Sequence, residues 1–286
     1  MARRAGAARH LTASTVDLGW LLIGELLALG VVSGFLAGLL GVGGGMMMVP
    51  FMTYILSSRG VDAGLAVKMA IATSMSTILF TSMASVRAHH GRGAVRWDVA
   101  RSLAPGIVGG GLLSGAGAFA ALKGQGLALF FALFIGFSAV QMLRDRKPTP
   151  GRSLPGAIGL TSVGAGIGFL SGLVGAGGAF MSVPFMVWCN VPIRQAVGTS
   201  AALGFPIALA NTVGYAIGGR DLPPALPGAF GYLYLPAVAV IAVASMALAP
   251  VGADVAHRTD VTRLKRVFAV LLFALAGYMF YKSQGG

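Results

Sequence analysis

Charged residues divide the chain into long uncharged intervals. Eight stretches contain no Asp, Glu, Lys or Arg: residues 26–58, 69–86, 102–122, 124–143, 153–193, 195–219, 222–253 and 267–281. A helix needs about 20 mainly apolar residues to cross the hydrocarbon core of a bilayer. The pattern therefore predicts an all-α polytopic membrane protein.

The two longest intervals, 26–58 and 153–193, are too long for one span and too short for three. Each contains a glycine cluster followed by a proline: Gly41, Gly43, Gly44 and Gly45 before Pro50, and Gly175, Gly177 and Gly178 before Pro184. Each interior glycine costs a helix about 1 kcal/mol relative to alanine. We therefore expect a long helix, a glycine break and a short helix in each interval, with the short helices beginning near Met46 and Phe180. With one helix from each of the other six intervals, this predicts eight full-length helices and two short ones.

The glycine-rich segments belong to an internal repeat. Residues 34–52 read GFLAGLLGVGGGMMMVPFM and residues 168–186 read GFLSGLVGAGGAFMSVPFM, identical at 13 of 19 positions with an offset of 134. The match continues downstream at an offset of 126, where Ala-Thr-Ser at 72–74 corresponds to Gly-Thr-Ser at 198–200. The chain is therefore predicted to be two copies of one unit.

The repeat sets the expected domain organisation. We expect a basic N-terminal tail (1–16), a first transmembrane repeat (17–143), a basic cytoplasmic linker (144–155) and a second transmembrane repeat (156–286), with about four to five helices in each repeat. Duplicated units with broken helices are typical of secondary transporters, whose substrate site lies at the midplane between the repeats.

Two orientations of the chain in the membrane are compatible with the sequence. If the short helices cross the membrane, each repeat has five spans and the second repeat is inverted relative to the first. If they are re-entrant, the N-terminus lies inside and the basic cluster at 258–266 faces out. We favour the inverted arrangement, because it keeps more basic residues inside and provides the symmetry that alternating access uses.

Composition and charge exclude several other classes of protein. The chain has 286 residues, 56% of them hydrophobic and only 10% charged, whereas a soluble domain is about a quarter charged. The net charge of +13 could indicate a polyanionic partner, but 15 of the 21 basic residues fall in four clusters, at 3–9, 87–101, 144–152 and 258–266. Such clusters are typical of cytoplasmic loops, so we expect a multi-pass inner (plasma) membrane protein that binds no nucleic acid.

The repeated motifs resemble those of a known transporter family. The paired glycine-rich segments with Val-Pro-Phe, the two Thr-Ser motifs and the loop His90-Gly-Arg-Gly-Ala-Val-Arg-Trp97 are similar to those of the TauE/SafE family, over roughly residues 18–281. The resemblance implies a membrane transporter of sulfur-containing anions such as sulfite, sulfoacetate and other organosulfonates. The expected partners are a small anion and the lipid bilayer, while a coupling proton or cation and a homo-oligomeric state are left open.

The glycine breaks and the paired hydroxyls are the main candidates for an anion site. Unpaired N–H groups at the start of a helix, together with the helix dipole, can hold an oxyanion, and hydroxyls can donate to it without a fixed charge in the membrane. Glycines also serve close helix packing, and Ser or Thr often bond only their own backbone. The candidates are Gly43, Gly44, Gly45, Thr73, Ser74, Gly177, Gly178, Thr199 and Ser200.

Four further polar residues lie in or beside the apolar segments. Asn211 corresponds to Ser85 in the repeat and lies about three helical turns beyond Ser200, so it either lines the path or links helices. Lys68 and Arg194 also correspond and are candidates for an anion entrance or for interfacial anchors. Glu25 is a candidate proton carrier, or it lies close enough to the interface to stay hydrated.

No sequence motif indicates a cofactor, a metal site or catalysis. The single cysteine, Cys189, excludes an intramolecular disulfide and a cysteine-based zinc site, and the chain has no His-Glu-x-x-His or Gly-x-Ser-x-Gly motif. We therefore expect a secondary transporter rather than an enzyme. A membrane-embedded enzyme and a structural membrane subunit remain the alternatives.

Overall fold

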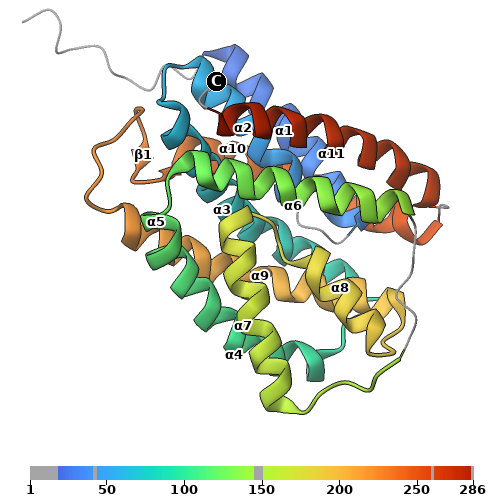
Figure 1. Cartoon of the computed structure of the whole chain (residues 1–286). Helices are drawn as coiled ribbons and strands as arrows, with labels where there is room; N and C mark the ends of the chain where they lie inside the picture. Colours follow the sequence, from blue (N-terminus) through green and yellow to red (C-terminus); the bar gives the residue numbers. More distant parts are fainter. Residues whose placement is uncertain (1–18, 41–43, 145–150, 259–260, 285–286) are drawn as a thin grey trace, which may run out of the picture.

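The computed structural model is almost entirely helical (Figure 1) and describes residues 19–40, 44–144, 151–258 and 261–284. The first half contains α1 (Trp20–Leu40), α2 (Gly45–Ser58), α3 (Ala63–His90), α4 (Trp97–Leu113), the π-helical segment η2 (Ser114–Ala118), α5 (Phe119–Ala121) and α6 (Gly124–Arg144). The second half contains α7 (Ala157–Val174), α8 (Ala179–Trp188), α9 (Ile193–Gly219), β1 (Ala229–Phe230), β2 (Leu233–Tyr234), α10 (Leu235–Arg258) and α11 (Val261–Ser283). The predicted all-α class is confirmed.

The sequence of long helix, glycine break and short helix occurs in both halves. The short helices α2 and α8 begin at Gly45 and Ala179, each one residue before the predicted start. The residues immediately before them, Gly44 and Gly178, have φ values of 70° and 76°, in the left-handed region that glycine adopts without a steric penalty. The part of the first break at residues 41–43, which includes Gly43, lies outside the described residues.

Seven helical segments of the described chain are long and apolar enough to cross a membrane: Trp20–Leu39, Ala63–His90, Trp97–Ala121, Gly124–Arg144, Ala157–Val174, Ile193–Gly219 and Leu235–Val255. Shorter apolar helices cover Gly45–Ser58, Ala179–Trp188 and Phe268–Ser283. The sequence predicts an eighth full-length span at α11. The apolar part of α11 in the described chain is Phe268–Ser283, the last of these shorter segments. The chain is a multi-pass membrane protein.

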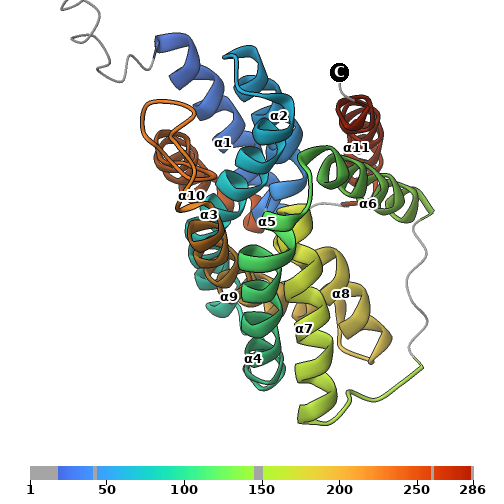
Figure 2. The same ribbon diagram turned by 60° about the vertical axis from the view of Figure 1, so that its left-hand side comes forward.

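Helices that correspond in the two repeats have corresponding neighbours. α1 packs along α10 and α7 along α4, while α3 packs against α9, and α6 against α11 (Figure 2). Glycines permit the closest approaches: a Cβ atom on Gly34 would lie 2.4 Å from the Cα of Ser245, and one on Gly168 would lie 2.2 Å from the carbonyl oxygen of Ile107. Small residues allow membrane helices to pack in this way. This exchange of partners between the two halves supports a duplicated unit. The inversion of the second repeat in the membrane stays a prediction.

The matched threonines Thr73 and Thr199 join the two repeats. The Thr199 hydroxyl oxygen accepts the backbone N–H of Arg96, which precedes α4, at 2.9 Å. The Thr73 hydroxyl oxygen accepts the backbone N–H of Tyr234, which precedes α10 and ends a short hairpin, at 3.1 Å. Both threonines are fully buried. Each repeat thus fixes the start of a helix that belongs to the other.

We expect Thr73→Val and Thr199→Val to destabilise the protein by about 1–3 kcal/mol each, because each change leaves a backbone N–H without its acceptor. Thr53→Val is the matched control, since the buried Thr53 hydroxyl only donates to the Val49 carbonyl in its own helix. Thermal unfolding of the purified variants measures the effect. Equal losses in all three variants would contradict the assigned role.

Candidate functional site

The two glycine breaks meet inside the protein. A Cβ atom on Gly45, at the start of α2, would lie 2.1 Å from the carbonyl oxygen of Gly175, at the end of α7. Gly175 has a φ of 70°, and a Cβ there would lie 3.1 Å from side-chain atoms of Val49 and Ile71. The backbones of the two breaks are therefore in direct contact, with no room for a side chain between them.

A small cavity lies beside this contact, between the long helices α3 and α9. Its lining residues come from α1, α3, the second break and α9: Ala37, Ile78, Thr81, Ser82, Ser85, Gly177, Ser200, Ala201 and Gly204. The cavity volume is about 10 Å³, which is room for about one water molecule. None of the lining residues is charged, so any polar ligand in the cavity would meet hydroxyl and backbone groups only.

Two of the cavity hydroxyls have a hydrogen atom left for a ligand. Ser82 donates to the Leu79 carbonyl, and Thr81 bonds the Thr77 carbonyl and the Ser245 hydroxyl. The Ser85 hydroxyl, by contrast, has no hydrogen-bond partner among the described residues although it is buried.

Ser200 is the second of these hydroxyls. It accepts a hydrogen bond from Ser182 at 2.9 Å, and no acceptor for its own hydrogen is found among the described residues. Because Ser182 lies on α8, this bond ties the short helix to α9 and fixes the position of the Ser200 oxygen. Ser85 and Ser200 are therefore the side chains best placed to donate to an anion in the cavity.

The second break adds backbone donors at the same place. The N–H groups of Gly175 and Ala176 donate to the Ser171 carbonyl, but those of Gly177 and Gly178 donate to no backbone carbonyl of the described chain. They lie at the N-terminus of α8, where the partial positive charge of the helix favours an anion. Gly177 itself lines the cavity. The geometry thus combines two hydroxyls with a helix N-terminus.

Not all of the matched polar residues face this cavity. Of the paired hydroxyls only Ser200 lines it, because the hydroxyls of Thr73 and Thr199 accept the backbone N–H groups described above. The Ser74 hydroxyl is fully buried and has no hydrogen-bond partner in the described chain. Asn211 lies where α9 meets α4 and α7, and its amide nitrogen donates to the carbonyls of Ile207 and Gly168.

The candidate entrance and coupling residues lie outside the cavity. The ammonium nitrogen of Lys68 donates to the Ala120 carbonyl at 3.0 Å and lies 5.8 Å and 5.3 Å from the ring centres of Phe119 and Tyr232, which favours an anchoring role. Arg194 is exposed in the first turn of α9.

Glu25 lies in α1 and forms an ion pair with Arg59, which follows α2, at 3.3 Å. Both side chains are partly exposed, a setting in which an ion pair contributes less than about 1 kcal/mol. This arrangement supports the interpretation of Glu25 as a hydrated residue near the interface more than its role as a proton carrier.

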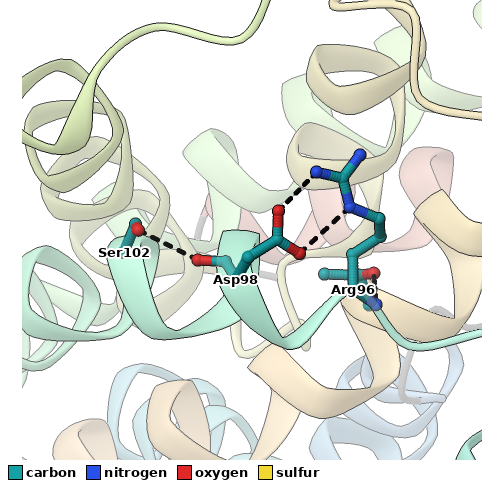
Figure 3. Close-up of polar contacts among 4 residues, drawn as sticks. Arg96, Asp98 and Ser102 are labelled. Atoms are coloured by element: carbon teal, nitrogen blue, oxygen red, sulfur yellow. Dashed lines mark hydrogen bonds and ion pairs between the residues drawn. The ribbon is translucent and has the colours of Figure 1, made fainter.

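The loop before α4 is basic, but two of its charges are paired. The Arg96 guanidinium bonds the Asp98 carboxylate through two nitrogens, and Ser102 donates to the Asp98 carbonyl (Figure 3). The bond to Asp98 raises the pKa of Arg96. Arg92 forms a second ion pair, with Asp254 of α10. These charges hold the loop in place beside Thr199 and do not reach the cavity.

Sequence reasoning missed the three polar cavity residues of α3. Thr81, Ser82 and Ser85 lie within about one turn of α3, and in the repeat Ser85 stood out only as the counterpart of Asn211. The signal was a cluster of three hydroxyls spaced for one face of an otherwise apolar helix. Among the described residues, no group of three His, Cys, Asp or Glu side chains could hold a metal ion.

Comparison with known proteins identifies the family. The model of the family described as sulfite exporter TauE/SafE matches residues 26–279, which include both breaks and the cavity. The chain belongs to the TauE/SafE family. This confirms the resemblance drawn from the repeated motifs, and the family is one of membrane transporters.

Relatives of this TauE/SafE protein cover nearly its whole length. It is 34% identical over 266 residues to a probable membrane transporter protein of Haemophilus influenzae, covering 90% of this chain and 97% of the relative. It is 25% identical over 273 residues to a probable membrane transporter protein of Methanocaldococcus jannaschii, covering 91% and 96%. A probable membrane transporter protein of Xylella fastidiosa is 28% identical over 263 residues, covering 89% and 93%. No solved structure matches the chain.

Proposed function

We propose that the protein is a secondary transporter of the inner (plasma) membrane that moves a small anion by alternating access. The substrate class is a sulfur oxyanion or an organosulfonate such as sulfite or sulfoacetate, in keeping with the name of the family. The observation that carries the proposal is the uncharged cavity beside the contact between the two breaks, where Ser85, Ser200 and the N-terminus of α8 offer hydrogen-bond donors.

The donors that line this cavity suit a small oxyanion, and the cavity, with a volume of about 10 Å³, would widen to admit one during transport. Sulfite and sulfonate groups carry several acceptor oxygens on one centre, and each can accept a hydroxyl or backbone N–H. Donors without a full positive charge bind an anion without the cost of a buried cation, about 2.5–3.5 kcal/mol for Lys or Arg in a membrane helix. They also leave the anion free to dissociate, which transport requires.

The break geometry supports alternating access. Gly45 and Gly175 bring the two halves of the molecule into backbone contact, while Thr73 and Thr199 tie each half to a helix of the other. If one repeat moves against the other, the contact between the two breaks must therefore rearrange. In a duplicated transporter the substrate site is expected at this interface.

Solute counterflow in proteoliposomes tests the proposal. Vesicles loaded with unlabelled sulfite or sulfoacetate should accumulate the labelled anion transiently, whereas vesicles loaded with acetate or succinate should not. Vesicles without protein are the control. If no sulfur anion exchanges under any applied gradient of pH, sodium or voltage, the proposed function is wrong.

A further inference from the structure

Ser182, on the short helix α8, donates its hydrogen bond to another helix. Serines in membrane helices often donate to a carbonyl of their own helix, as the buried Ser138 does to the Phe134 carbonyl. The fully buried Ser182 hydroxyl instead donates to the hydroxyl oxygen of Ser200 on α9, at 2.9 Å. This bond joins the helix that follows the second glycine break to a residue of the cavity wall.

The direction of this bond determines what Ser200 can offer. A hydroxyl group has one hydrogen to donate and two lone pairs that accept. One lone pair of Ser200 accepts the Ser182 hydrogen, so the hydrogen of Ser200 itself points away from the Ser182 oxygen. Ser200 is buried and lines the cavity, and the described chain provides no other acceptor for this hydrogen. It is therefore available to a ligand in the cavity.

Without the bond from Ser182, the Ser200 hydroxyl would be free to rotate. The carbonyl of Ala196 lies four residues before Ser200 in α9, which is the acceptor that a serine in a helix ordinarily uses. A hydroxyl turned to that carbonyl no longer presents its hydrogen to the cavity. A hydroxyl that accepts a hydrogen bond is also polarised, which strengthens the bond that it donates. Ser182 thus acts on both the direction and the strength of the Ser200 donor.

The first repeat lacks this arrangement. Met48 corresponds to Ser182, and Ser74 corresponds to Ser200. A thioether has no hydrogen to donate, and the Met48 sulfur instead accepts the hydroxyl hydrogen of Thr77 at 3.1 Å. The Ser74 hydroxyl has no hydrogen-bond partner in the described chain, and Ser74 does not line the cavity. Of the two matched serines, the one that accepts a bond from its short helix is the one in the cavity wall.

We propose that Ser182 is a positioning residue for the anion site, which holds the Ser200 hydrogen toward the cavity without touching the anion. Ser182 is not among the residues that line the cavity, so it acts only through Ser200. The inference rests on the proposed transport function and narrows its substrate. Because Ser200 presents a hydrogen, the group bound beside it must offer a lone pair, as a sulfite or sulfonate oxygen does.

Replacement of Ser182 tests the assignment. Ser182→Ala should raise the anion concentration for half-maximal counterflow about tenfold, the lower end of the effect of losing one hydrogen bond to a charged ligand, and should leave the maximal flux unchanged. Ser182→Thr keeps the hydroxyl and should restore the wild-type half-saturation. Ser138→Ala is the matched control, because its hydroxyl bonds only its own helix, and it should behave as the wild type.

A double-mutant cycle distinguishes positioning from a general structural role. Because Ser182 acts only through Ser200, Ser182→Ala should cause no further loss of affinity when Ser200 is already replaced by alanine. Altered packing of α8 would instead lower the affinity in both backgrounds. Equilibrium binding of the labelled anion to the four purified proteins measures this coupling without a contribution from transport rates. Thermal unfolding shows that each protein is folded.

Three results would overturn the role of Ser182. They are wild-type half-saturation in the folded Ser182→Ala protein, an equal loss in a folded Ser182→Thr protein, and the same fold-change from Ser182→Ala with and without the Ser200 hydroxyl. If Ser182→Thr fails to fold, the double-mutant cycle decides. If Ser182→Ala fails to fold, Ser182→Cys takes its place, because a thiol is only a weak donor.

The same measurements separate this inference from the proposed function. If the wild type exchanges and binds no sulfur anion, the proposed function is wrong and the role of Ser182 falls with it. If the wild type transports the anion and Ser182→Ala has the wild-type affinity, only the role of Ser182 is wrong.

Discussion

Replacing Gly45 with alanine is expected to abolish transport and to lower stability by about 3 kcal/mol, the upper end of the usual cost of overpacking. The new Cβ would lie 2.1 Å from the Gly175 carbonyl oxygen. That oxygen belongs to the backbone of the opposite break, so no side-chain rotation can relieve the clash. The two breaks would have to separate, which moves both away from the cavity. Thermal unfolding and anion counterflow measure the two effects.

Gly109→Ala is the matched control for this substitution. Gly109 lies within α4, and a Cβ atom there would meet nothing within 4 Å. Because alanine favours helix over glycine, the control should be neutral or more stable by about 1 kcal/mol. A Gly45→Ala protein with the stability and flux of this control would show that the breaks do not pack as described.

Substitution of the cavity serines is expected to weaken anion binding while leaving the fold intact. Ser85→Ala and Ser200→Ala each remove one donor to a charged ligand, and such a bond contributes about 1.5–3 kcal/mol. Each variant should therefore raise the substrate concentration for half-maximal flux about tenfold to one-hundredfold. The double variant should show no saturable flux.

The Ser138→Ala variant separates this effect from a general loss of hydroxyls. Ser138 lies on α6, outside the cavity, and donates only to the backbone of its own helix. Its flux should match that of the wild type. Unchanged half-saturation in Ser85→Ala and Ser200→Ala would exclude these hydroxyls from the substrate path.

The fold was largely predictable because it follows from strong local signals. Uncharged intervals of span length indicate membrane helices whatever their neighbours are, and clustered glycines break a helix at a definite place. Both short helices accordingly begin within one residue of the predicted positions at Met46 and Phe180. The short hairpin of β1 and β2 and the π-helical turn at Ser114 carry no comparable signal, since each depends on contacts with distant helices.

The candidate site was only partly predictable, because a hydroxyl's role depends on which atom it meets. Thr199 and Ser200 are neighbours in the sequence, yet Thr199 accepts a backbone N–H and Ser200 lines the cavity. Asn211 was recognised as a buried polar residue, but its amide orientation depends on carbonyls of α7 and α9. Gly44, Gly175 and Gly178 were identified correctly as break positions, while the contact between Gly45 and Gly175 across the two repeats required the structure.

Equilibrium binding of the transported anion to purified protein tests the central claim most directly. The labelled sulfur anion with the largest counterflow is dialysed against wild-type protein, the Ser85→Ala/Ser200→Ala double variant and the Ser138→Ala control. The account predicts saturable binding of one anion to the wild type and to the control, and its loss in the folded double variant. Undiminished binding in the double variant would contradict the claim that the anion is held beside the contact between the two glycine breaks.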